Sequence, residues 1–200
     1  MMIDSLEIEA NAWEYATLKT SLIWRWITEV TKQNTNFENE NKFSFDDVKI
    51  KIVSAANKAA AITALASATP LKLNRFRIAL NKNLMQNQEL WSLDIANIFN
   101  QNLTIEWDFE SIYRDKTQYD IFDDWVKKYV EVEIKNLNKV IGTDQHPTLK
   151  LFLNQVSFQT WSKTNDVNSI VTQTVWFVWE YNTTDSEAIY ITLQNEIETY

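Results

Sequence analysis

The sequence predicts an α+β fold, in which an antiparallel β-barrel or sandwich carries one packed amphipathic helix and a helical N-terminal extension. Alternating apolar and polar residues mark several strands in the second half of the chain. A stretch between them has apolar residues at helical spacing. Ala55–Ala68 has high helix propensity and is followed by Pro70. We therefore divide the chain into a mostly helical N-terminal extension (1–70) and a β-rich domain (71–200).

Composition limits the class of protein. The chain has 200 residues, of which 45% are hydrophobic, so it can bury a full core. Its net charge of −8 argues against tight binding of nucleic acid through phosphate neutralisation. With no cysteine, disulfides and thiolate chemistry are excluded. Met1–Glu9 is acidic and lacks the apolar core of a signal peptide, and no apolar run approaches the length of a membrane span.

The beginning of the chain fits two patterns. Over Asn11–Lys32, the residues Leu18, Leu22 and Trp26 lie on one helical stripe. Alternatively, Leu22, Trp24 and Trp26 alternate as they would on a strand. We favour the helix.

The next segment mixes a strand, a basic patch and a short helix. Lys49–Val53 alternates like a strand and follows Ser44–Asp47, which matches a capping box. Leu71–Leu80 carries Arg75 and Arg77 beside apolar residues; this patch is either a solvated face, the simpler interpretation, or a contact with an acidic neighbour. Leu90–Asn100 is expected to form a short helix.

The second half is easier to interpret. Leu103–Phe109 alternates cleanly, and Val130, Val132 and Ile134 form a second alternating set. Glu187–Gln194 is expected to be the last strand. Between the first two, a helix is predicted from about Thr117 to Tyr129. The residues that mark its packed face are Phe122, Trp125, Val126 and Tyr129.

Two long strands, Thr148–Trp161 and Ser169–Tyr181, organise the predicted sheet. Inside the first, the alternation slips by one position between Leu153 and Val156, which is typical of a β-bulge. The second is apolar on both faces at Val175–Trp179, so both faces must be covered, one by the core and the other by a helix or a neighbouring subunit. The candidate interface residues are Trp176, Val178 and Trp161.

The order of these elements resembles the second half of contractile-tail tube proteins, the tubes of phages and related injection systems, together with the baseplate proteins that start the tube. The segments that carry the resemblance are Leu103–Phe109, Tyr119–Trp125, Tyr129–Ile134, Leu151–Phe158 and Asn168–Tyr181. It implies a tube-protein-like protomer in a six-fold ring, with rings stacked into a channel. The expected partners are further copies and other tail proteins, with DNA passing without specific binding. The expected location is the virion tail, after synthesis in the host cytoplasm. A repeating tube subunit, a tube initiator and a tail-completion protein all fit.

Enzymatic functions find little support. His146, the only histidine, precedes Pro147 in a turn, and one glycine cannot build a phosphate-binding loop. Glu131 and Glu133 share a strand face, but alternating charge on an exposed strand explains them more simply. We expect no catalytic, cofactor-binding or metal-binding residues, no small-molecule substrate and no membrane partner.

The main alternative is a β-rich surface binding module for carbohydrate or protein. The chain holds nine tryptophans, and aromatic rings on a β-scaffold can stack on sugars. The candidate stacking residues are Trp161, Trp176 and Trp179.

Overall fold

The structure is a computed structural model that describes residues 2–23, 42–88, 90, 95–114, 116, 119–120, 123, 127–164, 169–179 and 181–195. Strands dominate these residues. In chain order the strands are β1 (Met2–Asn11), β2 (Thr17–Ile23), β3 (Val48–Val53), β4 (Arg75–Asn81), β5 (Met85–Gln88), β6 (Ile95–Phe99), β7 (Thr104–Ile112), β8 (Lys128–Lys135), β9 (Thr148–Lys163), β10 (Thr172–Trp179) and β11 (Ile189–Gln194). They are accompanied by the 3-10 turn η1 (Phe45–Asp47) and the helix α1 (Lys58–Ser67).

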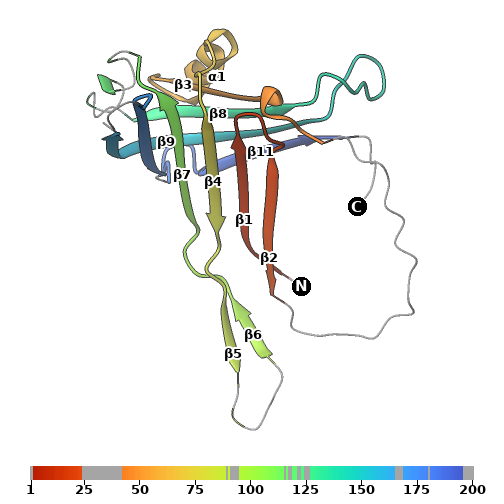
Figure 1. Cartoon of the computed structure of the whole chain (residues 1–200). Coiled ribbons are helices and arrows are strands. Elements are labelled where there is room, and N and C mark those ends of the chain that lie inside the picture. Colours follow the sequence, from red (N-terminus) through yellow and green to blue (C-terminus); the bar gives the residue numbers. More distant parts are fainter. Residues whose placement is uncertain are drawn as a thin grey trace.

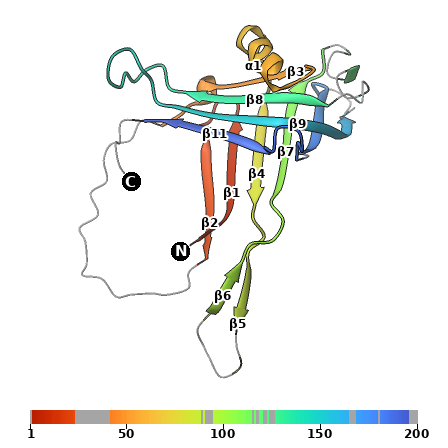
Figure 2. The ribbon, with the colours of Figure 1, turned by 180° about the vertical axis from the view of Figure 1, so that it is seen from behind.

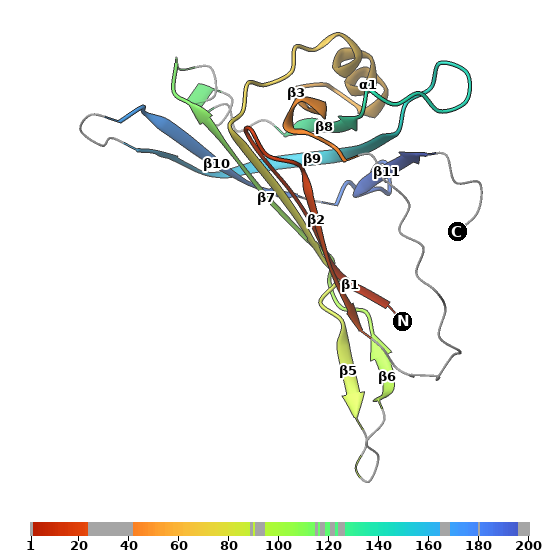
Figure 3. The ribbon, with the colours of Figure 1, turned by 45° about the vertical axis from the view of Figure 1, so that its right-hand side comes forward.

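Nine of these strands form one antiparallel sheet in the order β2-β1-β4-β7-β10-β9-β8-β3, with β11 also pairing with β9. The sheet is strongly curled. Strands β1, β2, β4 and β7 run roughly across β3, β8, β9 and β11, so that the two sets form two walls (Figures 1 and 3). Strand β9 belongs to both, because one half pairs with β10 and the other with β8 and β11. The structure therefore confirms a β-rich fold with a curled, half-barrel sheet.

The predicted bulge in β9 is confirmed. Lys128 pairs with Val156 but Val130 pairs with Leu153, so one residue of β8 faces two of β9. Gln155, at the extra position, has a φ of 62°. A bulge bends and twists its strand locally. This bend lies where β9 passes from β8 to β10, which explains how one strand serves both walls.

The main core fills the space between the walls. Trp107 stacks on Phe177 with ring centroids 4.1 Å apart, and Phe109 lies 5.0 Å from the same ring. Leu151 and Leu153 of β9 complete it from the other wall. All five side chains are almost fully buried, as the alternation of β7 and β9 predicts.

The opposite face of the β8–β9 pair is covered by α1. Ala61 and Leu65 of the helix pack with Tyr129 and Phe152, forming a second small cluster. The helix begins at Asn57, whose side chain accepts a hydrogen bond from the Ala60 N–H at 2.9 Å. The predicted helix within Ala55–Ala68 is confirmed. Its small side chains allow close approach to the sheet, which is why β8 and β9 are buried on both faces.

The helical N-terminal extension is not what the structure shows. Thr17–Ile23 is a strand antiparallel to Met2–Asn11, so the preference for helix is wrong over these residues. Both β1 and β3 belong to the same sheet as the later strands. Strand β1 pairs with β4, which is distant in the sequence. The spacing of apolar residues within β1 and β2 cannot reveal this partner. Trp24 and Trp26 lie outside the described residues.

Two other helix predictions need correction. Within Leu90–Asn100, residues Ile95–Phe99 form β6, which pairs with β5. Of the predicted helix at 117–129, Tyr119, Asp120 and Asp123 are helical, but Tyr129 is a buried residue of β8. Pairing with Val53 of β3 is available at Tyr129, and it overrides the helical spacing of the apolar residues. The other three residues of that stripe, Phe122, Trp125 and Val126, lie outside the described residues.

The hairpin formed by β5 and β6 projects away from the rest of the molecule. It continues β4 and β7 beyond the edge of the two walls, as the views from both sides show (Figures 1 and 2). We call β5, Leu90 and β6 the arm.

Candidate functional site

The wall formed by β2, β1, β4, β7 and β10 has one apolar and one polar face. Because side chains alternate along a strand, residues directly opposite one another share a face. Glu9, Arg77, Asp108 and Trp176 are opposite one another on successive strands β1, β4, β7 and β10. These side chains point away from the core. We call this side of the wall the polar face.

A ladder of ion pairs crosses the polar face. Lys19 Nζ lies 3.0 Å from Glu7 Oε1, and Arg77 Nη2 lies 2.8 Å from Glu7 Oε2. Arg75 Nη2 lies 2.5 Å from Asp108 Oδ2, and Arg77 Nη1 is 3.8 Å from Asp108 Oδ1. The ladder thus links four adjacent strands, from β2 to β7.

The ladder shifts the protonation equilibria of its members. Hydrogen bonds from Lys19 and Arg77 lower the pKa of the Glu7 carboxyl below its usual value. In return, the Glu7 carboxylate raises the pKa of Lys19 and that of Arg77. Protonation of Glu7 would break its ion pairs with Lys19 and Arg77, and these pairs make that protonation harder.

Asp108 is fully buried although it lies on the polar face. The Arg75 and Arg77 side chains, both about one-third exposed, hold it. A buried carboxylate is tolerated only where it is paired. The basic patch predicted at Leu71–Leu80 thus contacts an acidic neighbour within its own chain.

The polar face has an excess of negative charge. Three cations, Lys19, Arg75 and Arg77, stand against five carboxylates, which leaves a net charge of −2. The five carboxylates are Glu7, Glu9, Glu106, Asp108 and Glu110. A surface of this kind repels phosphate rather than binding it.

The three predicted interface residues do not share one surface. Trp176, 41% exposed, and Val178 both lie on the polar face. Trp161 is opposite Val175 on the core face, packs against the main core and donates its Nε1–H to Gln173 Oε1 at 3.1 Å. Only Trp176 and Val178 are therefore placed to contact a neighbour on the polar face.

The residues considered for catalysis have structural contacts. His146 Nδ1 lies 2.6 Å from the Lys139 carbonyl oxygen, in the turn between β8 and β9. Glu131 lies 3.8 Å from Lys51, and Glu133 lies 3.3 Å from Lys150. Within the described ranges, no cluster of three or more side chains of the metal-binding types could hold an ion. Nor does any helix in the described part of the chain have the length and apolar character needed to cross a membrane.

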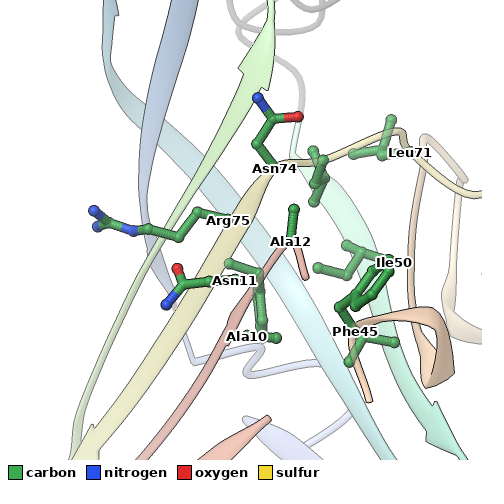
Figure 4. Close-up of a pocket in the computed structure, with 11 residues that line it drawn as sticks. Ala10, Asn11, Ala12, Phe45, Ile50, Leu71, Asn74 and Arg75 are labelled. Atoms are coloured by element: carbon green, nitrogen blue, oxygen red, sulfur yellow. The ribbon is translucent and has the colours of Figure 1, made fainter. Parts of the chain in front are cut away.

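A second candidate surface lies at the turn between β1 and β2. A cavity of about 80 Å³ opens there, lined by apolar side chains, among them Phe45, Ile50 and Leu71, and by the polar Asn11, Asn74 and Arg75 (Figure 4). This volume is well below the roughly 300–1,000 Å³ of small-molecule sites. It fits one apolar side chain better than a ligand. We call this place the turn end.

Trp13 stands beside this cavity and is not singled out by any sequence pattern. Its side chain is 88% exposed, and its ring centroid lies 5.4 Å from that of Phe45. Its φ of 72° lies in the left-handed region, which is strained for a bulky residue. Strained and exposed residues of this kind cluster at functional sites. The only signal in the sequence is a tryptophan, between Ala12 and Glu14, that no apolar alternation explains.

Compared with models of known protein families and with curated proteins, the sequence matches none.

Proposed function

We propose that this chain is a virion structural protein, a tail tube or tube-like baseplate component, which assembles into a ring that forms part of a conduit for DNA. The observation that carries the proposal is the polar face, an acidic surface on a wall whose other face is the core. In this proposal the protomer is a tube-protein-like half-barrel, and the polar face lines the channel.

The charge of the polar face suits a conduit. DNA binds proteins mainly through neutralisation of its phosphates by lysine and arginine. On the polar face Lys19, Arg75 and Arg77 are already paired with carboxylates. In a ring, each subunit would present to the channel a wall with a net charge of −2 and paired cations. The channel would then repel the phosphates of DNA from every side, so DNA would slide through without specific binding.

The edges of the sheet support assembly. Within the nine-stranded sheet, β2, β3 and β11 each pair on one side only. Exposed strand edges are usually protected or paired with another chain, and a closed ring supplies partners for them without an open end. Trp176 and Val178 add apolar surface at the β10 side of the polar face. In a ring, we expect these two residues to contact the neighbouring subunit.

The proposal is tested by the size and shape of the purified protein. Light scattering and negative-stain electron microscopy should show rings of the native chain, six-fold in end view. Trp176→Glu should leave a folded monomer, because a charge at this position is incompatible with an apolar contact but accessible to water in the monomer. The matched control is Leu137→Glu, at an exposed leucine in the β8–β9 turn, which should still form rings.

One result would contradict the ring, and another would contradict the place of Trp176 in its interface. A native chain that stays monomeric at every concentration would exclude it. If Trp176→Glu unfolds the chain instead of releasing monomers, Trp176 belongs to the fold rather than to an interface.

The alternative function, a surface module for carbohydrate or protein, is favoured by a different observation. Trp161 and Trp179 pack against the core and do not form a common platform with Trp176. Trp13 and Tyr15, however, are both exposed at the turn end. Titration with soluble glycans, followed by tryptophan fluorescence, tests this. Saturable quenching that Trp13→Ala abolishes would support the module; no change at any concentration would leave the ring proposal as the better account.

A further inference from the structure

Two places with exposed apolar side chains, the turn end and the arm, lie at opposite ends of strand β4. Strand β4 begins at Arg75, opposite Asn11, next to the cavity of the turn end. It ends at Asn81, opposite Ser5, where the chain enters the arm. The seven residues of β4 separate the two features by roughly 23 Å along the strand direction. A copy of the molecule displaced along this direction brings the arm of one to the turn end of the next.

The arm has the properties of a segment that is covered in the assembled protein. Met85 and Phe99 are directly opposite each other and both exposed, and Leu90 is 89% exposed. A two-stranded hairpin is marginally stable alone in water. Natural proteins protect exposed strand edges with charge, yet from Asn83 to Leu103 the only charged residues of the sequence are Glu89 and Asp94.

The turn end can receive such a segment. Its cavity of about 80 Å³ has a mixed lining, in which apolar side chains such as Phe45 and Leu71 lie beside polar ones, and it stands beside the exposed ring of Trp13. The space is of the size of one aliphatic side chain and too small for a typical ligand. An exposed leucine that enters it would bury apolar surface of both partners.

Charge also favours a second copy as the occupant. Two chains of net charge −8 repel each other over most of their surfaces. At the turn end, exposed Lys42 and Lys72 balance exposed Glu14 and Asp46. A segment that carries acidic residues, as the sequence does on both sides of Leu90, would therefore find lysines and no excess of negative charge there.

We infer that the arm of one copy docks on the turn end of the next, with Leu90 in the cavity beside Trp13. The contact joins two different patches of the same chain, so it is heterologous and continues from copy to copy rather than closing on itself. It rests on the proposed function in one respect: in a ring-forming protein this contact stacks one ring on another.

The absence of cysteine makes a direct cross-linking test possible. In the double variant Leu90→Cys/Ala12→Cys, one thiol replaces the arm leucine and the other lines the cavity. A disulfide requires Cα atoms about 4.4–6.8 Å apart, so it forms only if the two sites meet. Because the sites lie at opposite ends of β4, the bond joins different copies. Mild oxidation of the full-length protein should then give a ladder of linked subunits on a non-reducing gel.

The controls separate docking from random collision. Each single variant can give at most a linked dimer. The matched pair Leu90→Cys/Ile62→Cys places the second thiol at an exposed isoleucine on α1, which lies near Asp185 and lines no part of the turn-end cavity, and should give no ladder. A second measurement uses Leu90→Asp, which should abolish stacks in the electron microscope while single rings persist.

Each outcome has a distinct meaning. If the double variant forms rings but no ladder, the docking is overturned and the ring proposal stands. The same holds if Leu90→Asp forms stacks as long as those of the native chain. A ladder in a protein that forms no rings supports the docking and counts against the ring. Equal ladders in the test and control pairs, or no association of any kind, overturn the docking.

Discussion

The two faces of β7 are built from adjacent residues of one strand but are held by different forces. Trp107 and Phe109 point into the core and are almost fully buried, whereas Glu106 and Asp108 belong to the polar face. The core face is stabilised by the burial of apolar side chains. This contribution to the free energy of folding is large and does not depend on the exact orientation of the groups. The polar face depends on ion pairs, which are directional and individually weak where they are exposed.

This difference separates what the fold needs from what the surface is free to do. Replacing core aromatics removes stability that no other residue supplies. Most residues of the polar face can be substituted with little loss of stability. Function rather than folding can therefore determine the excess of acidic residues on this face. Asp108 is the exception, because it is charged and fully buried at once. The following predictions test this contrast, beginning with the largest expected effect.

Trp107→Ala should cause the largest loss of stability. The ring stacks on Phe177 at 4.1 Å and meets the edge of Phe76 at 6.0 Å. Truncation of a buried tryptophan costs roughly 3–5 kcal/mol. For a chain of this size that corresponds to a fall in melting temperature on the order of 6–20 °C by circular dichroism. Glu106→Ala, on the same strand but exposed, is the control. Equal shifts in melting temperature for the two variants would contradict the proposed difference between the two faces.

Asp108→Ala should cause an intermediate loss. It removes the buried carboxylate and leaves Arg75 and Arg77 without it, both being partly accessible to water. We expect a cost of about 1–3 kcal/mol in the free energy of unfolding, measured in urea. A double-mutant cycle with Arg75→Ala sharpens the result, since paired residues should be non-additive. Additive effects would show that the ion pair contributes nothing.

Glu7 should make stability depend on acid. Its pKa is lower in the folded than in the unfolded protein, so its contribution is present above the unfolded value of about 4.3 and is lost as the pH falls through the lower folded value. Urea unfolding of the native chain should therefore become easier in this acid range. Glu7→Gln should show a shallower dependence than the native chain. Identical pH profiles would mean that the ladder does not act on Glu7 in solution.

Lys19→Ala should have the smallest effect. The lysine side chain is largely exposed, and solvent screens its attraction to Glu7 and Glu9. The melting temperature should stay close to that of the native chain, and added salt should remove any difference. A loss comparable with that of Asp108→Ala would show that the edge strand β2 depends on this lysine for its place in the sheet.

Several elements follow from local sequence alone. The alternation of Leu103–Phe109 predicts β7 and its buried face, and the slip between Leu153 and Val156 predicts the bulge at Gln155. The alanine-rich stretch predicts α1. In each case the pattern repeats with the period of the structure it forms, and the neighbours along the chain carry enough information.

Other features were decided by contacts between distant parts of the chain. Thr17–Ile23 and Ile95–Phe99 became strands because β1 and β5 lie beside them, although helix was expected at both places. Trp161 faces the core because it is paired with Val175, a choice that its own neighbours do not reveal. Helical hydrogen bonds join residues four apart, so local sequence can specify them; strand pairing and ion pairs such as Arg75–Asp108 join residues far apart, and only the folded chain brings them together.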